Sequence, residues 1–182
     1  MNFPTILIAI GLTLICLWGL HKFFYNRSLS LSSALVASYK SKRTDRSYPI
    51  HIMIGAPAGL PNESISLHIS EQAFTGGTLP VSVTDANHLV NSAVPGEAGN
   101  TIIYGHNLNV VFGYLVDARV GNPVNIYTDD GHLHKYTITE IQIVAPSQTA
   151  LLAPTTREVL TLYTCTGLLD SLRFVVRAMP VK

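Results

Sequence analysis

Residues 160–165 read Leu-Thr-Leu-Tyr-Thr-Cys, and seven residues later the stretch 173–178 reads Arg-Phe-Val-Val-Arg-Ala. Both stretches alternate as a half-buried strand does, with Leu160 and Leu162 on one face and Cys165 on the other. Two alternating runs joined by a short loop that contains a glycine predict an antiparallel hairpin. The fold of the surrounding domain is expected to be built around this hairpin.

The simplest symmetric register of the hairpin places Cys165 opposite Arg173, on the face away from the core. Arg177 then lies opposite Thr161, about 13 Å further along the strand. A thiol beside a guanidinium at a strand end indicates a chemical role. The alternative for Cys165 is a buried apolar role. Arg177 is the competitor for the role of Arg173, and the alternative for Arg177 is an exposed strand arginine.

Composition excludes one class of partner and isolates one thiol. The 182-residue chain has a net charge of +1 and only 13% charged residues, so a nucleic-acid-binding function has no electrostatic support. Its two cysteines, Cys16 and Cys165, are far apart in the sequence, and we do not expect them to form a disulfide. Cys165 is therefore the one thiol outside the apolar N-terminus.

The N-terminus is predicted to anchor the protein in a membrane. Residues 3–20 contain no charged side chain, and 18 helical residues span about 27 Å, enough for the hydrocarbon core. Trp18 and the aromatic run 23–25 follow at the expected boundary. We predict an uncleaved anchor over residues 1–27, with a cleaved signal peptide as the alternative.

Residues 28–47 are rich in serine and basic residues and lack periodicity, which predicts a flexible tether. The positive charges follow the apolar segment rather than precede it. Taken alone, this charge distribution would place the remaining domain in the cytoplasm.

From residue 48 to residue 182 the chain reads as a single domain of short strands separated by turn signals. Eight strands without a long helix predict an all-β, closed or nearly closed barrel with short helices at 84–93 and 110–119. A change of apolar parity predicts a bulge near 139–140. The predicted strands are 48–54, 65–69, 79–84, 101–106, 123–128, 132–144, 160–165 and 172–179.

Residues 95–107 read Pro-Gly-Glu-Ala-Gly-Asn-Thr-Ile-Ile-Tyr-Gly-His-Asn, and glycines bracket a strand that ends at His106. A histidine at a strand end after a glycine is well placed to project into a cleft. The commoner alternative is a surface histidine.

These segments together resemble the sortases, which are membrane-anchored cysteine transpeptidases. The sortase signature Thr-Leu-x-Thr-Cys matches residues 161–165, Arg173 follows at the start of the last strand, and residues 95–106 resemble the stretch that carries the family histidine. The resemblance covers about residues 48–181. It implies the eight-stranded β-barrel that the strand pattern predicts independently.

The resemblance implies a role for each site residue. Cys165 would attack a peptide carbonyl as a thiolate, His106 would act as general acid and base, and Arg173 would hold the developing oxyanion. The implied substrate-binding residues are Thr164, Asn107, Leu151 and Leu152. The two leucines belong to the loop 145–157 before the hairpin, which in sortases walls the signal-peptide groove, and simple loop packing is their alternative.

The implied reaction cuts a sorting signal such as Leu-Pro-x-Thr-Gly and transfers the acyl group from Cys165 to an amine of a cell-wall precursor or a pilin lysine. It requires surface proteins as partners and an extracellular domain on a single-pass membrane protein, which outweighs the charge distribution. The alternatives are a thiol peptidase that releases its product to water and a non-catalytic surface β-barrel binding module.

No cofactor or metal is expected. His132 and His134 share a strand face beside the Asp130-Gly131 turn, a spacing compatible with a metal. No third ligand lies near them in the sequence, and the 11 acidic residues are not clustered, so we predict solvated histidines and assign no calcium site.

Overall fold

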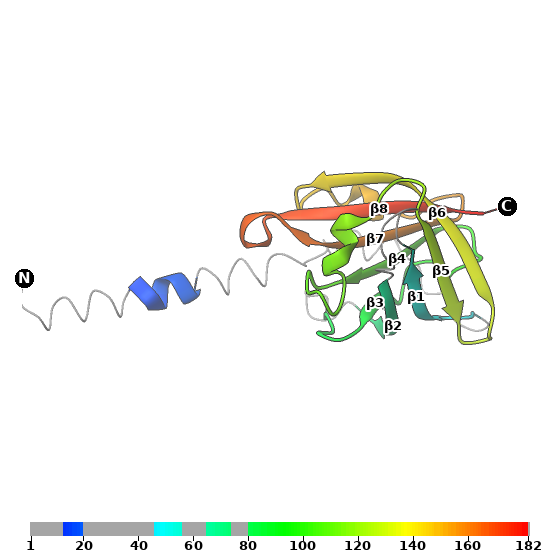
Figure 1. The fold of residues 1–182 in the computed structure, drawn as a ribbon, viewed down its shortest axis with the longest axis horizontal. Coiled ribbons are helices and arrows are strands. Elements are labelled where there is room, and N and C mark those ends of the chain that lie inside the picture. The colour runs from blue at the N-terminus through cyan, green and yellow to red at the C-terminus, as the bar shows by residue number, and fades with distance from the viewer. Residues whose placement is uncertain (1–12, 20–45, 56–64, 74–79, 182) are drawn as a thin grey trace, which may run out of the picture.

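Eight strands close into a barrel in the computed structural model, which describes residues 13–19, 46–55, 65–73 and 80–181 (Figure 1). The strand order around the barrel is β1-β2-β3-β4-β7-β8-β6-β5, and the pairs β2–β3 and β4–β7 are parallel. The strands are β1 Pro49–Ile54, β2 Ile65–Gln72, β3 Ala86–Leu89, β4 Asn100–Gly105, β5 Pro123–Thr128, β6 Leu133–Val144, β7 Val159–Thr166 and β8 Leu172–Pro180. Short 3-10 turns lie at η1 Gly113–Asp117, η2 Thr149–Leu152 and η3 Leu168–Asp170.

The predicted hairpin is β7–β8, and its register is the predicted one. Cys165 pairs with Arg173, and Thr161 pairs with Arg177. Leu160 and Leu162 point into the barrel, where they join the main hydrophobic core with side chains from every strand of the sheet. The period-2 alternation of the hairpin therefore identified its inner face correctly.

The opposite face of the hairpin lies away from the core, as predicted, but it is not open to water. A second apolar cluster covers the outer face of β3, β4, β7 and β8, and Cys165 on that face is only 3% exposed. The segment between β6 and β7 supplies part of this cover. The cluster is made of Leu89, Ile102, Tyr104, Leu152, Tyr163 and Val175.

The third predicted strand and the helix after it are wrong. Residues 80–85 form no strand and bend at 83–85, and β3 occupies the middle of the predicted helix 84–93. The buried side chain of Asn87 accepts a hydrogen bond from Ser82 N at 3.0 Å and donates one to Tyr104 O at 3.2 Å. Sheet pairing with β2 and β4 on both sides thus outweighs the local helix signal.

Two smaller sequence features are confirmed. The register of β6 against β8 shifts between Ile138 and Glu140, which is the bulge predicted at 139–140. The turn η1 lies within the predicted helical segment 110–119. The long strand β6 pairs with β5 through residues 133–137 and with β8 through residues 136–144, and so closes the barrel.

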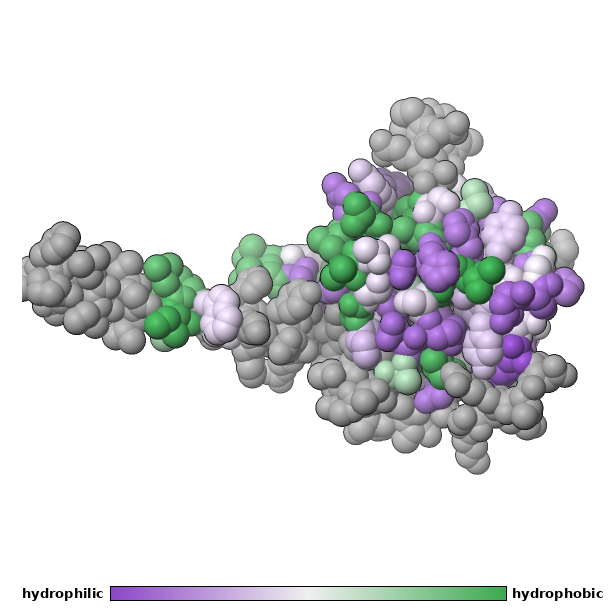
Figure 2. Space-filling view, turned by 90° about the horizontal axis from the view of Figure 1, so that it is seen from below, coloured by the Kyte–Doolittle hydropathy of each residue, from purple (hydrophilic) through white to green (hydrophobic). Residues whose placement is uncertain are grey.

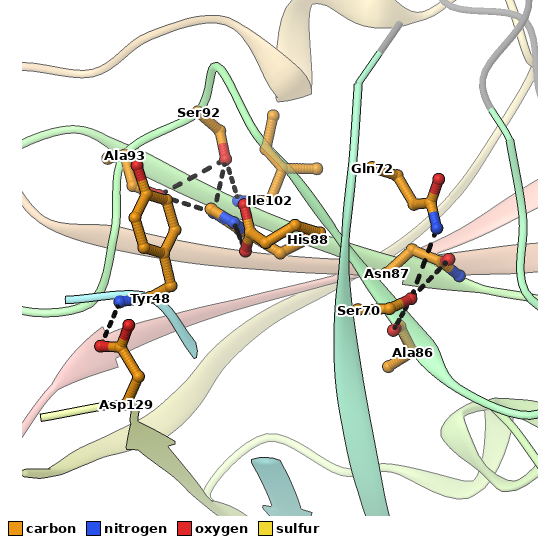
Figure 3. A network of polar contacts seen from close by, with 11 residues as sticks. Tyr48, Ser70, Gln72, Ala86, Asn87, His88, Ser92, Ala93, Ile102 and Asp129 are labelled. Carbon is orange, nitrogen blue, oxygen red and sulfur yellow. Dashed lines mark hydrogen bonds and ion pairs between the residues drawn. The ribbon is translucent and has the colours of Figure 1, made fainter. Parts of the chain in front are cut away.

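A buried polar network fastens β2, β3 and the turn after β3 (Figure 3). His88 is fully buried, and its Nδ1 lies 2.6 Å from a carboxylate oxygen of Glu71. Its Nε2 lies 3.0 Å from both Ser92 Oγ and Ala93 O, and Ser92 Oγ accepts a hydrogen bond from Ile102 N. One imidazole therefore joins three consecutive segments of the barrel.

The N-terminal prediction is described only in part. Residues 13–19 form a helix whose apolar side chains are exposed (Figures 1 and 2). Most of the predicted anchor 1–27 and tether 28–47 lies outside the described residues. Within the described residues, no helix has both the length and the hydropathy needed to cross a bilayer.

We predict that His88→Leu lowers the free energy of unfolding by about 2–4 kcal/mol, because it leaves buried partners of the imidazole without a hydrogen bond. His68→Ala, at an exposed position of β2, is the control and should change stability by less than about 0.5 kcal/mol. Urea unfolding followed by circular dichroism measures both values. Equal stabilities of the two variants would contradict a structural role for the network.

Candidate active site

Three neighbouring strands bring the predicted site residues together. Gly105 at the end of β4 pairs with Thr164 of β7, so His106 and Cys165 each follow one residue beyond the same pair. On the other side of β7, Cys165 pairs directly with Arg173 of β8. Because adjacent strands lie about 4.8 Å apart, the imidazole, thiol and guanidinium share one end of one sheet.

The position of His106 is fixed by the chain that follows it. Its carbonyl accepts a hydrogen bond from Phe112 N at 3.1 Å, which folds the loop before η1 back over the end of β4. Gly105 allows this approach, since a Cβ there would lie 2.8 Å from Val111 Cγ1. Partial burial lowers the pKa of His106 below the usual imidazole value, and the nearby Asp170 carboxylate opposes that shift.

Arg173 is buried, with 6% of its surface exposed, yet one of its donor groups has no hydrogen-bond partner among the described residues. Its Nη1 donates hydrogen bonds to Asp170 O at 2.9 Å and to Leu172 O at 2.6 Å. Its Nη2 is buried and has no hydrogen-bond partner among the described residues. A permanently charged buried donor without a partner suits a site that receives an oxyanion or a carbonyl.

The turn between β7 and β8 adopts a costly backbone conformation. Leu169 and Asp170 have φ values of 52° and 58°, in the left-handed region that non-glycine residues avoid. Each such residue typically costs about 1–3 kcal/mol. In this conformation the Asp170 carbonyl accepts the hydrogen bond from Arg173, so the turn orients the guanidinium.

Stacked aromatic rings lie beside the three residues, on the outer face of β4 and β7. The rings of Tyr104 and Tyr163 are 5.4 Å apart at an interplanar angle of 17°. Tyr104 donates its hydroxyl hydrogen to Pro80 O at 2.8 Å, and burial raises the pKa of both tyrosines, so both stay neutral. Both rings are buried, so they form an apolar surface beside Cys165 that is covered in this structure.

The loop between β6 and β7 covers the far part of this surface. Leu152 is buried in the outer cluster, a position that fits loop packing, the alternative to substrate binding. Leu151 is half-buried beside it. Asn107 is exposed, one residue after His106. Thr164 is fully buried and donates its hydroxyl hydrogen to Gly105 O at 2.9 Å, so its side chain joins β7 to β4. Substrate contact by these residues stays a prediction.

Other candidates take structural positions. Arg177 lies 3.6 Å from the Glu140 carboxylate in an ion pair, further down β8 than Arg173. His132 pairs with Asp130 at 2.8 Å and is exposed. Within the described ranges, no group of three or more potential metal-ligating side chains occurs.

Two residues with evident positions at the site were not assigned a role from the sequence. Asp170 acts on both His106 and Arg173, and its part depends on a backbone conformation that no local pattern indicates. Asn100 lies within the quoted stretch 95–107, and its buried amide bonds to the β6–β7 loop. The one feature of the sequence that could have indicated this role is the position of Asn100 between two glycine-containing segments.

Comparison with known proteins gives a consistent result. A family model described as Sortase domain matches residues 60–181. Sortase A from Corynebacterium diphtheriae is 30% identical, with a TM-score of 0.59 over 77% of this chain and 63% of that chain. Its lid mutant is 24% identical, with a TM-score of 0.60 over 90% and 95% of the two chains. The pilus-related sortase C of Group B Streptococcus is 23% identical, with a TM-score of 0.60 over 91% and 87%. No curated protein matches the chain.

We predict that a small methanethiosulfonate reagent modifies Cys165 in the folded protein, because Cys165 lies at the end of β7 directly opposite the permanently charged Arg173. The exposed Cys16 is first replaced by serine so that one thiol remains. Intact-mass spectrometry should show one adduct on Cys16→Ser and none on Cys16→Ser/Cys165→Ala. An unmodified Cys165 in native protein would instead support a non-catalytic binding module.

Proposed function

Because the chain belongs to the sortase family, we propose that it is a cysteine transpeptidase that cleaves a sorting signal and transfers the acyl group to an amine. The observation that carries the proposal is the register of β4, β7 and β8, which aligns His106, Cys165 and Arg173 at one sheet end. Members of this family use these three residue types for acyl transfer. The substrate class is a peptide of the Leu-Pro-x-Thr-Gly kind on a surface protein.

In the first half-reaction the Cys165 thiolate attacks the carbonyl carbon of the scissile Thr–Gly bond. The carbonyl oxygen becomes an oxyanion, and Nη2 of Arg173 is the donor that remains to bind it. The protonated His106 gives its proton to the departing amine as the C–N bond breaks. The product is a thioester on Cys165, and His106 is then neutral.

In the second half-reaction an amine attacks the thioester carbon, and neutral His106 accepts the proton that the amine loses. Collapse of the intermediate releases the Cys165 thiolate and forms a new amide. The lowered pKa of His106 helps this step, because it favours the neutral imidazole that acts as the base. The same lowering reduces the fraction of molecules that carry the imidazolium needed to start the cycle.

We propose further that the domain works outside the cell, held by the apolar segment 3–20 and the tether 28–47. The support is the hydropathy of the segment and the sorting-signal chemistry, whose protein and amine substrates are at the cell surface. The acceptor class is a cell-wall precursor amine or a pilin lysine.

Replacing Arg173 by lysine should lower kcat by about 100- to 1,000-fold, because the ammonium group cannot hold the turn carbonyls and an oxyanion together. The substrates are a Leu-Pro-x-Thr-Gly peptide and a glycine-based amine, and the ligated product is quantified by mass spectrometry. Arg177→Lys, on the same face of β8, is the matched control and should retain wild-type kcat. Cleavage by wild type without any ligated product would indicate a thiol peptidase instead.

Replacing Asp170 by asparagine should move the acid limb of the kcat/KM–pH profile to lower pH and reduce the plateau. The carboxylate raises the pKa of His106, so its removal lowers that pKa further and leaves less imidazolium. The backbone carbonyl that holds Arg173 is retained, and asparagine tolerates the left-handed conformation. An acid limb that stays in place or moves to higher pH would contradict the assignment of that limb to His106.

A further inference from the structure

We propose that Asn100 is a positioning residue that latches the β6–β7 loop onto the barrel and thereby sets how tightly the apolar part of the sorting signal is recognised. The inference rests on the proposed function and adds a residue that touches none of the reacting atoms. It is carried by three hydrogen bonds from one fully buried amide.

The Asn100 amide is shared between the loop and the sheet. Its Nδ2 donates to Leu151 O and to Ala153 O, both at 3.1 Å, and its Oδ1 accepts from Thr161 Oγ1 at 2.7 Å. Both amide hydrogens are thus used on the loop and the oxygen on β7. Asn100 and Thr161 are both fully buried, so the bond between them forms away from water, and a buried Asn100 amide without its loop partners would be costly.

The two loop carbonyls bracket Leu152, which fixes its side chain against the outer cluster. Leu151 is then held half-buried next to it, packed against the outer cluster that also contains Tyr104 and Tyr163. Asn100 stands at the start of β4 and His106 follows its end, about 20 Å apart along the strand. The latch is therefore remote from the thiol and acts on substrate residues distant from the scissile bond.

The neighbouring backbone strengthens the same connection. Gly99 N donates to Arg157 O at 3.2 Å, and Val159 N donates to Gly99 O at 2.8 Å, so the end of the loop is also joined to this corner. Gly99 has a φ of 137°, and a Cβ there would lie 2.7 Å from the Ala93 Cβ. The Gly99-Asn100 pair thus fixes the loop where it returns to β7.

Asn100→Asp, made in the full-length protein, separates the hydrogen bonds to the loop from the hydrogen bond to Thr161. A carboxylate keeps the Thr161 contact but has no hydrogen to donate, and it sets negative oxygens against two carbonyls. We expect KM for a Leu-Pro-x-Thr-Gly peptide to rise about tenfold or more with little change in kcat. The preference for that peptide over Ala-Pro-x-Thr-Gly should fall, while the methanethiosulfonate labelling rate of Cys165 stays at the wild-type value.

A second pair of variants covers the possibility that Asn100→Asp does not fold. Thr161→Val removes the hydroxyl that holds Asn100, whereas Thr101→Val removes a buried hydroxyl that has no hydrogen-bond partner among the described residues. The two threonines are fully buried on adjacent strands. Thr161→Val should raise KM and reduce the leucine preference in the same direction, and Thr101→Val should change neither.

Amide hydrogen exchange of residues 149–153 gives a readout that does not depend on activity. Faster exchange in Asn100→Asp and Thr161→Val than in Thr101→Val supports the latch, and equal exchange overturns it. A kcat loss with unchanged KM and unchanged leucine preference also overturns the positioning role. If wild-type protein processes no peptide, the proposed function fails and recognition by the loop fails with it, whereas the exchange data still decide whether the latch exists.

Discussion

The parallel pairing of β4 with β7 is the constraint on which the site depends. It sets Gly105 beside Thr164, and the Thr164 hydroxyl bonded to Gly105 O fixes that alignment from inside the barrel. A slip of one residue would turn Cys165 toward the core and separate it from His106. Parallel strands need a long connection between them, and here that connection includes β5, β6 and the loop that covers the outer face.

The outer face of the sheet contains buried polar atoms that have no hydrogen-bond partner among the described residues. Cys165 and Arg173 are both almost fully buried, yet Nη2 of Arg173 and the hydroxyl of Tyr163 have no hydrogen-bond partner among the described residues. Buried polar atoms in a native protein are normally satisfied, and exceptions concentrate where a ligand completes them. Low polarity around the guanidinium also strengthens its attraction for a developing negative charge.

The alternation of apolar and polar side chains predicted the features that depend on neighbouring residues in the sequence. The hairpin, its register and the bulge in β6 follow from side-chain parity, which neighbouring strands must match. The error at β3 arose because Thr84-Asp85 resembles a helix start, whereas the buried amide of Asn87 and pairing on both sides determine a strand. The roles of Asn100 and Asp170 depend on residues more than 50 positions away or on backbone geometry, and no short-range pattern carries either.

The β7–β8 turn has a consequence for how members of this family can diverge. One residue, Asp170, orients the guanidinium through its carbonyl and influences the imidazole through its carboxylate. A loop exchanged with a relative would therefore alter cation geometry and proton affinity at once, even if every residue of the triad were retained. A replacement loop would have to rebuild both effects together. The side chains of Leu168 and Leu169 are exposed, but the left-handed backbone at Leu169 restricts which residues fit there.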